Sequence, residues 1–403
     1  MAVTIDGANI VVLAVLVWYL GSLVNKLLPL LDRYAIPVAV TGGLLCSLAV
    51  AAIHYLFGLQ ILFDTGLRDL LLLAFFSTIG LSAKLATLRE GGRALVVLLI
   101  AAAVLLVLQD VTGVALALAL GAHPGFGVMG GSVSLAGGHG TAIAWGDVAE
   151  AAGLAGAKEW GIAFATLGLI AGGLIGGPLA QRMIRRNAIA GRRDPLADAA
   201  LPDLTAAPDL QPPVSSALTT LALLALCIEG GHWVNLLLSA EGFTLPGFLT
   251  AMLIGILLTN LADLVRVKLD AVALQRASDI SLQLFLAMSL MSMQLWLIAS
   301  AFGQILLILF AQILVITLFV DWVVFRLMGR DYDAAVIAAG FAGMGLGATP
   351  VGIANMAAVT AKFGPSPKAF LVIPLVGAFF LDLMNALVIK FFLGLPFMQA
   401  AGD

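Results

Sequence analysis

The chain has 403 residues, of which 62% are hydrophobic and 11% are charged, and its formal net charge is −3. This composition excludes a soluble globular protein, because apolar runs of about 18 residues or more recur along the whole chain. We therefore expect an all-α polytopic membrane protein that is surrounded by lipid, and no nucleic-acid partner.

The apolar runs predict ten membrane spans in two sets of five. The residues before the first span contain one charged side chain, Asp6, and no basic region or cleavage site of a signal peptide, so this span is expected to stay in the protein. In chain order the predicted spans are 9–28, 36–57, 69–83, 93–120, 158–183, 217–238, 246–262, 278–297, 301–325 and 369–392.

Two further segments, 124–157 and 334–360, are too rich in glycine and polar residues for lipid-facing helices. Irregular backbone at membrane depth is tolerated where it is buried in protein or lines an aqueous cavity. Charge placement indicates that both segments dip into the membrane without crossing it. With both termini outside, seventeen of the 20 Lys and Arg residues lie inside, and Arg68, Lys158 and Lys390 lie outside. A crossing at the first segment would place the arginine cluster after the fifth span outside, against the positive-inside bias.

An odd number of spans in each half predicts an inverted repeat. The first repeat covers 1–186 with hairpin 124–157, a cytoplasmic linker rich in Pro, Ala and Asp covers 187–213, and the second repeat covers 214–403 with hairpin 334–360. Such repeats, with interrupted segments in corresponding positions, are typical of secondary transporters. Residues that recur at offsets of 208 to 211 favour this interpretation: Pro37 and Thr41 with Pro246 and Thr250, Asp69 and Phe75 with Asp279 and Phe285, Asp110 with Asp321, and Gly137 and Thr141 with Gly345 and Thr349.

Each glycine-rich segment is expected to form a re-entrant hairpin whose tip lies near the middle of the membrane. Short helices that meet there would direct N–H groups toward one point and carbonyl groups toward another, which suits a small anion that travels with a cation. No Lys or Arg is predicted at mid-depth, so backbone donors and hydroxyl groups remain for a carboxylate. The predicted substrate ligands are Ser134, Gly137, Gly138, His139, Gly140, Thr141, Gly345, Gly347, Thr349 and Asn355.

The last span contributes predicted ligands for sodium. Asp382 and Asn385 lie three residues apart, hence on one helical face, and an ionisable residue inside a membrane is a candidate functional residue. With Ala348 and Thr349 they form the candidate Na⁺ ligands. Asp382 could instead pair with an ammonium group of the substrate, and the structural alternative is a protonated Asp382 that forms a hydrogen bond with a neighbouring hairpin.

Other residues in the spans are expected to have structural roles. Asp110 would hold helices together, and the glycine row Gly168, Gly172 and Gly176 would allow close helix packing. For His139, a structural hydrogen bond and a direct contact with substrate both stay open.

The glycine-rich segments resemble those of the bacterial sodium/glutamate symporters. The resemblance extends over nearly the whole chain, and it implies Na⁺-coupled uptake of L-glutamate without another cofactor, two inverted halves, a homodimer, an elevator motion and a location in the bacterial inner membrane. Ala136, Phe341 and Val351 depart from residues common in that family, so no site role is carried over to them. The stretches that carry the resemblance are GGHGTAIAW (137–145), GLGATPVGIANM (345–356), RDLLLLAFFSTIGL (68–81), YDAAVIAAG (332–340) and VGAFFLDLMNALVIK (376–390).

Three alternatives stay open. A sodium-coupled carrier of another amino acid or dicarboxylate would show the same pattern. An intramembrane hydrolase would use Ser132 or Ser134 with His139, which requires the hairpin to fold back on itself. A passive channel would use the glycine loops as a filter.

Overall fold

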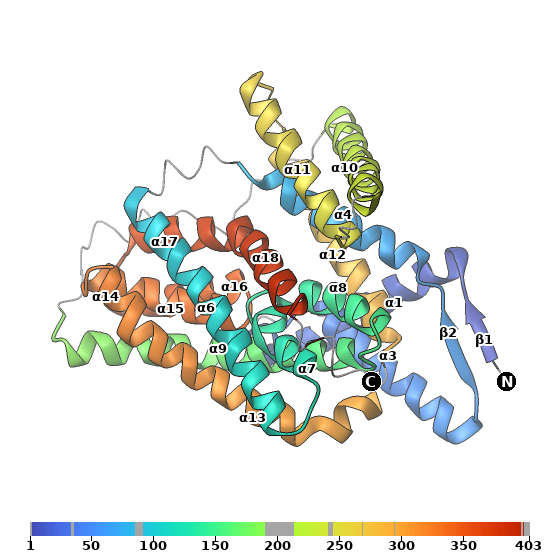
Figure 1. The fold of residues 1–403 in the computed structure, drawn as a ribbon, viewed down its shortest axis with the longest axis horizontal. Coiled ribbons are helices and arrows are strands. Elements are labelled where there is room, and N and C mark those ends of the chain that lie inside the picture. The colour runs from blue at the N-terminus through green and yellow to red at the C-terminus, as the bar shows by residue number, and fades with distance from the viewer. Residues whose placement is uncertain are drawn as a thin grey trace. The chain divides into compact units, whose positions relative to one another are not determined.

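The computed structural model describes residues 2–33, 36–84, 92–189, 213–240, 245–267, 269–293, 295–395 and 398. These residues are almost entirely helical, with one pair of short strands (Figure 1). Residues 190–212, which make up most of the predicted linker, lie outside the described residues.

Seven of the described helices are long and apolar enough to cross a membrane, and each coincides with one of the ten predicted spans. The chain is therefore an integral membrane protein with several spans. The seven stretches are Gly7–Leu27, Val38–Phe57, Gly92–Ala119, Ala157–Arg186, Val214–Leu238, Gly247–Leu264 and Phe302–Leu327.

The other three predicted spans are helical as well, but each differs from a long apolar helix. Helix α4 (Gly66–Ser82) has 17 residues. Helix α12 (Ala271–Met291) contains polar residues in its first half, among them Arg276 and Asp279. The last span is divided into α17 (Pro367–Leu375), the π-helical turn η4 (Val376–Phe380) and α18 (Leu381–Leu393). Their crossing of the membrane stays a prediction.

The chain divides into two compact units, and each unit takes helices from both halves of the sequence. The boundary between the units therefore does not coincide with the boundary between the two predicted repeats. Unit 1 comprises Met1–Asp32, Pro37–Ala86 and Ala207–Leu295, and unit 2 comprises Arg33–Ile36, Thr87–Ala206 and Trp296–Asp403.

The described part of unit 1 contains six long helices, and small residues allow them to approach closely. Helix α11 packs against α4 and α10, while α12 packs against α3 and α4 (Figure 1). A Cβ atom on Gly80 of α4 would lie 2.1 Å from the carbonyl oxygen of Met252 in α11, so this crossing requires glycine. The helices are α1 (Gly7–Leu27), α3 (Val38–Phe57), α4, α10 (Val214–Ala240), α11 (Gly247–Leu264) and α12, with the short α2 (Pro29–Arg33) after α1.

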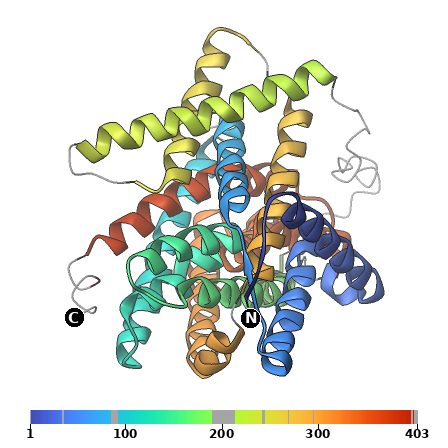
Figure 2. The same ribbon diagram turned by 90° about the vertical axis from the view of Figure 1, so that its right-hand side faces the viewer.

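Unit 1 also contains the strands, which the all-α expectation did not include. Strand β1 (Ala2–Ile5) runs parallel to β2 (Gln60–Phe63), and the two lie side by side (Figure 2). These segments of four residues lie outside the apolar runs, and their pairing satisfies backbone groups that no helix uses. The pair joins the start of the chain to the loop after α3.

Two positions that recur between the sequence halves have the same local structure. Pro37 precedes α3 with φ −60° and ψ 140°, and Pro246 precedes α11 with φ −57° and ψ 139°. The backbone nitrogens of Thr41 and Thr250 donate to the carbonyl oxygens of these prolines and close the first turn of each helix. Both helices therefore begin in the same way.

Unit 2 surrounds one fully buried helix. Every residue of α15 (Tyr332–Leu346) is buried, and this helix packs against α9 (Ala157–Arg186) and α16 (Thr349–Phe363). The remaining elements are α6 (Gly92–Ala119), α7 (Pro124–Val128), η1 (Met129–Val133), α8 (Gly138–Ala151), α13 (Leu295–Phe319), η3 (Val320–Val324), α14 (Phe325–Leu327), α17, η4 and α18.

Candidate functional site

Both glycine-rich segments are interrupted helices. In the first, the backbone leaves the helical region at Gly131 (φ −104°, ψ −131°), and α8 begins at Gly138. In the second, α15 ends at Leu346 and α16 begins at Thr349, with an extended Ala348 between them. The second interruption lies among the glycines that were predicted to permit it, whereas the break at Gly131 was not predicted and precedes the predicted glycines Gly137 and Gly138. The re-entrant orientation of the two segments stays a prediction.

The start of α8 meets the second interruption within unit 2. Gly138 has a φ of +66°, and a Cβ atom built on it would lie 3.3 Å from the carbonyl oxygen of Gly347. Helix α8 begins at Gly138 and α16 begins at Thr349, and no side chain of a described residue caps either N-terminus. Uncapped N–H groups and the positive ends of two helix dipoles therefore lie next to this contact, which favours a negatively charged ligand.

The predicted close packing of the glycine row in α9 is confirmed. A Cβ atom on Gly168 would lie 2.3 Å from the carbonyl oxygen of Leu346, and one on Gly176 would lie 2.2 Å from Nδ2 of Asn355. Between them, the carbonyl oxygen of Gly172 accepts a hydrogen bond of 2.9 Å from Nδ2 of Asn355. Asn355, a predicted substrate ligand, is thus attached to α9 by its nitrogen.

His139 lies at the start of α8 and contacts Thr166 of α9. The His139 Nε2 and Thr166 Oγ1 atoms are 2.9 Å apart, and the same hydroxyl donates to the carbonyl oxygen of Ile162 at 2.9 Å. A hydroxyl has one proton, so while Thr166 donates to Ile162 the donor in the contact with Thr166 is Nε2 of His139. This arrangement leaves Nδ1 as the acceptor of the imidazole ring.

The serine hydroxyls near the first interruption have partners other than His139. The hydroxyl of Ser132 donates to Oδ2 of Asp110 at 3.0 Å, and that of Ser134 donates to the carbonyl oxygen of Met129 at 2.5 Å. Within the described part of the chain, these bonds do not form the serine and histidine pair that a hydrolase requires.

The other predicted substrate ligands also lie in unit 2. A Cβ atom on Gly137 would lie 2.6 Å from the Thr141 side chain, and one on Gly345 would contact the side chains of Leu105 and Ile316. Thr349 is half-buried beside Gly377 of η4, and Gly140 is buried in the first turn of α8. The structure thus places all the predicted substrate ligands on α8, α15, α16 and the residues that lead into them.

The predicted sodium ligands lie on two elements of unit 2. Nδ2 of Asn385 in α18 donates to the carbonyl oxygen of Ser132 at 3.0 Å. The carbonyl oxygen of Ala348 accepts from the backbone nitrogen of Gly352 at 3.2 Å. Asp382 is half-buried and forms no hydrogen bond or ion pair with another described residue.

A buried polar group around the first interruption was not expected to take part in the site. The Asp110 carboxylate accepts hydrogen bonds from the backbone nitrogen of Ser132 at 2.7 Å and from its hydroxyl at 3.0 Å. Nε2 of Gln312 donates to the carbonyl oxygens of Gln109 at 2.7 Å and Gly130 at 3.1 Å. The available sequence signal was the position of these polar residues in the middle of apolar spans.

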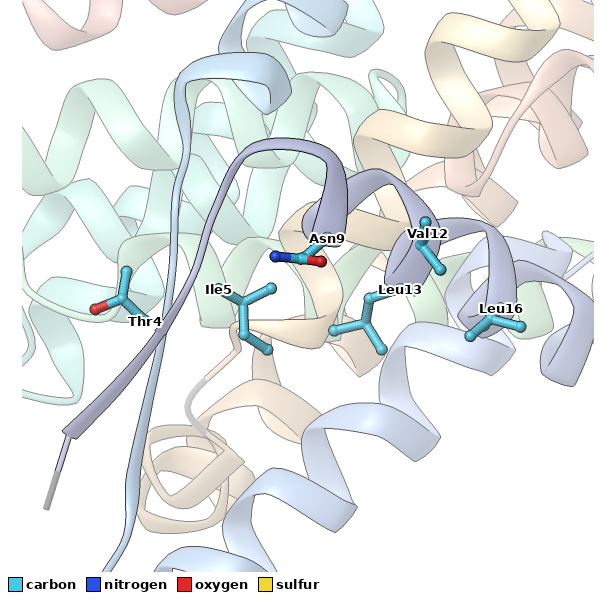
Figure 3. A pocket seen from close by; sticks show the side chains of 6 residues that line it. All are labelled: Thr4, Ile5, Asn9, Val12, Leu13 and Leu16. Atoms are coloured by element: carbon cyan, nitrogen blue, oxygen red, sulfur yellow. The ribbon is translucent and has the colours of Figure 1, made fainter.

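A shallow groove on unit 1 contains none of the predicted site residues. It is lined by six residues of β1 and α1, and its walls are mostly apolar (Figure 3). Val12 and Leu16 are each 58% exposed, as expected for side chains on the outside of a membrane helix. The lining residues are Thr4, Ile5, Asn9, Val12, Leu13 and Leu16.

Seven described helices that can span a membrane, together with two interrupted helices that approach each other at Gly138 and Gly347, are typical of an integral membrane transport protein. The family model of the sodium/glutamate symporter matches residues 3–365. The chain belongs to the sodium/glutamate symporter family, as the resemblance in its glycine-rich segments indicated. It is therefore a transporter rather than an enzyme.

Several curated relatives match over nearly the full length of both chains. The sodium/glutamate symporter of Escherichia coli (strain K12) is 43% identical over 399 residues, which are 97% of this chain and 98% of the relative. That of Shigella flexneri gives the same values. The sodium/glutamate symporter of Haemophilus influenzae (strain Rd) is 38% identical over 396 residues, with the same shares of both chains.

Proposed function

We propose that this protein carries L-glutamate into the cell together with Na⁺, by alternating access across the bacterial inner membrane. The relatives are named as sodium/glutamate symporters, which supports both the substrate and the coupling ion. The contact between Gly138 and Gly347, with an uncapped helix N-terminus on each side, is the observation that carries the proposal.

The substrate carboxylates would bind to N–H groups at the starts of α8 and α16. Helix N-termini stabilise anions through free N–H groups and the helix dipole. The hydroxyls of Thr141 and Thr349 and the Nδ1 atom of His139 would add polar contacts. Asp382, Asn385 and Thr349, with the carbonyl of Ala348, would bind Na⁺.

The proposed topology has two inverted repeats, 1–186 and 214–403, with both termini outside and the linker inside. Each unit receives helices from both halves, which supports the repeat. The pairing of β1 with β2 joins two segments that the topology places outside. Ion pairs of Lys84 with Asp263 at 3.0 Å and of Arg186 with Asp321 at 3.6 Å join residues that it places at the inside end.

We further propose an elevator motion in which unit 2 carries the substrate. All predicted substrate and sodium ligands belong to this unit, which is compact by itself and therefore suited to move as one body. The proposal of a homodimer rests on the resemblance to the family.

Uptake by liposomes that contain the purified protein tests this function. With sodium-free buffer inside, labelled glutamate should accumulate when the outside contains NaCl and should stay at background when choline replaces sodium. Excess unlabelled aspartate and other dicarboxylates test the alternative substrates. Equal uptake in sodium and in choline would refute the coupling, and a passive channel would equilibrate glutamate without concentrating it.

A pair of threonine variants tests the site. Thr349→Ala removes a hydroxyl at the start of α16 and should raise the KM for glutamate. Thr219→Ala is the control, because this exposed hydroxyl in α10 donates to the carbonyl of Ser215, outside the predicted site. An unchanged KM in Thr349→Ala would exclude this hydroxyl as a ligand.

A further inference from the structure

Polar side chains from three helices of unit 2 form hydrogen bonds with the backbone or side chain of residues at the first interruption, between Gly130 and Ser132. Asp110 of α6 accepts from the nitrogen and hydroxyl of Ser132. Gln312 of α13 donates to the carbonyl oxygen of Gly130, and Asn385 of α18 donates to that of Ser132. Their exposed fractions are 0% for Asp110 and Gln312 and 1% for Asn385.

The orientation of both amide groups is fixed by these bonds. A carbonyl oxygen accepts and cannot donate, so the nitrogen of Gln312 must face Gly130 and that of Asn385 must face Ser132. The oxygens Oε1 of Gln312 and Oδ1 of Asn385 are thereby left buried without a hydrogen-bond donor among the described residues. Native proteins rarely leave a buried acceptor without a partner, so an ion or a water molecule is expected at these two oxygens.

The charge of the Asp110 carboxylate also indicates a bound ligand. Asp110 forms no ion pair with a described residue, and its two hydrogen bonds from Ser132 use two of about four lone-pair positions on the carboxylate. A buried carboxylate without a cationic partner is costly. A cation that binds carboxylate and amide oxygens would compensate this charge and satisfy both amides.

The space beside the carboxylate depends on glycine. A Cβ atom on Gly131 would lie 2.5 Å from Oδ1 of Asp110, where any larger residue would occupy the position next to this oxygen. Within the described residues, no group of three or more His, Cys, Asp or Glu side chains is placed to hold a metal ion. The oxygen donors of one carboxylate and two amides suit a hard cation better than a transition metal, and the single negative charge matches a monovalent ion.

We infer that Asp110, Gln312 and Asn385 form a Na⁺ site at the interruption near Gly131, with Asp110 as its charged ligand. The inference rests on the proposed sodium-coupled function. It makes Asp110, and not Asp382, the charged ligand of Na⁺. Asn385 is common to both sets of ligands. Sodium at this position would hold α6, α13 and α18 against the break that precedes α8, and so link ion binding to the start of the proposed substrate site.

Asp110→Asn is the decisive variant. The side-chain oxygen of Asn can still accept from the backbone nitrogen of Ser132, so this hydrogen bond can persist while the charge is lost. Loss of outer-shell partners lowers metal affinity by about 10-fold to 100-fold, so loss of a charged ligand should raise the half-saturating Na⁺ concentration for glutamate uptake by at least about tenfold. A purely structural Asp110 predicts no change.

Gln312→Met provides a second variant with nearly the same side-chain volume and no amide oxygen. It should also raise the half-saturating Na⁺ concentration. Gln283→Met is the matched control, because Oε1 of Gln283 already accepts a hydrogen bond of 3.2 Å from Nε1 of Trp18 in unit 1. Its sodium dependence should equal that of the wild type.

A binding measurement without transport completes the test. A cation that binds the folded state raises the thermal midpoint with its concentration. Without glutamate, NaCl should raise the midpoint of the purified wild-type protein above its value in choline chloride, and this increase should disappear in Asp110→Asn and Gln312→Met. If Asp110→Asn does not yield a monodisperse protein, Gln312→Met and the wild-type titration decide.

The possible outcomes distinguish a failure of the Na⁺ site at Asp110 from a failure of the proposed transport function. Wild-type uptake that ignores sodium contradicts the proposed function. Wild-type uptake that depends on sodium, together with unchanged sodium affinity in both variants, overturns the site at Asp110 and assigns the two amide oxygens to water. A rise of the thermal midpoint with NaCl that persists in both variants would also overturn the site at Asp110.

Discussion

A Cβ atom on Gly138 would lie 3.3 Å from the carbonyl oxygen of Gly347, so the two interrupted helices approach each other through glycine on both sides. Gly138→Ala adds this atom and also strains the backbone, because φ is +66° and the left-handed conformation costs an L residue about 1 to 2 kcal/mol. We expect a lower thermal midpoint and weaker glutamate uptake, measured in detergent and in liposomes.

Gly153→Ala is the control for backbone strain. Gly153 has a φ of +99°, and a Cβ atom there would meet no atom of a described residue within 4 Å. This variant should lose stability to a similar degree but keep the wild-type KM for glutamate. Equal KM values in both variants would show that the contact of Gly138 with Gly347 does not shape the substrate site.

Adjacent glycines in α9 provide a second pair of variants. A Cβ atom on Gly176 would lie 2.2 Å from Nδ2 of Asn355, whereas one on Gly177 would meet nothing within 4 Å. Gly176→Ala should destabilise the protein by about 1 to 3 kcal/mol through overpacking. Gly177→Ala should be neutral or slightly stabilising, because alanine is the better helix former. Thermal unfolding of the two proteins under the same conditions measures the difference, and identical midpoints would contradict the close packing of α9 with α16.

The bond between His139 and Thr166 distinguishes the two roles that the sequence left open for the histidine. Thr166→Val removes the hydroxyl and leaves the Nε2 proton of His139 without its acceptor, at a cost of about 1 to 3 kcal/mol. Thr166→Ser keeps the hydroxyl and should restore stability. If the KM for glutamate rises in the destabilised Thr166→Val and equals the wild-type value in Thr166→Ser, His139 acts through its hydrogen bond. A large rise in KM in Thr166→Ser, at wild-type stability, would contradict a role of His139 through this hydrogen bond.

Cysteine labelling tests the proposed orientation in the membrane. Asp64 lies in the exposed loop after β2, which the topology places outside, and Arg266 lies in the exposed loop after α11, which it places inside. In a background without Cys46 and Cys227, Asp64→Cys should react with a membrane-impermeant maleimide added to intact cells. Arg266→Cys should react after the membrane is opened. The reverse pattern would invert the whole topology.

Local sequence patterns predicted those features that depend on nearby residues. Long apolar runs identified the seven helices that can span a membrane, because length and composition alone define such a helix. Glycine identified the contact of Gly138 with Gly347, since Gly138 has a positive φ and few other residues permit such a close approach, but it did not identify the break at Gly131. The spacing of Gly168, Gly172 and Gly176 predicted a packing surface for the same reason.

Contacts between distant segments could not be predicted in this way. Gln312 reaches Gly130 across 182 positions of the sequence, and nothing near either residue indicates the other. The pairing of β1 with β2 joins segments too short for a recognisable alternation of side chains. The division into two units also depends on tertiary packing, because each unit collects helices from both halves.

The π-helical turn η4 has a consequence for the helix that follows it. A π turn contains about one residue more than an α turn, and one residue rotates an α-helix by about 100°. Without the extra residue, α18 would present a different side toward η1, and the amide of Asn385 would point away from the carbonyl oxygen of Ser132, which it now reaches at 3.0 Å. The single additional residue thus sets the rotational phase of the last helix.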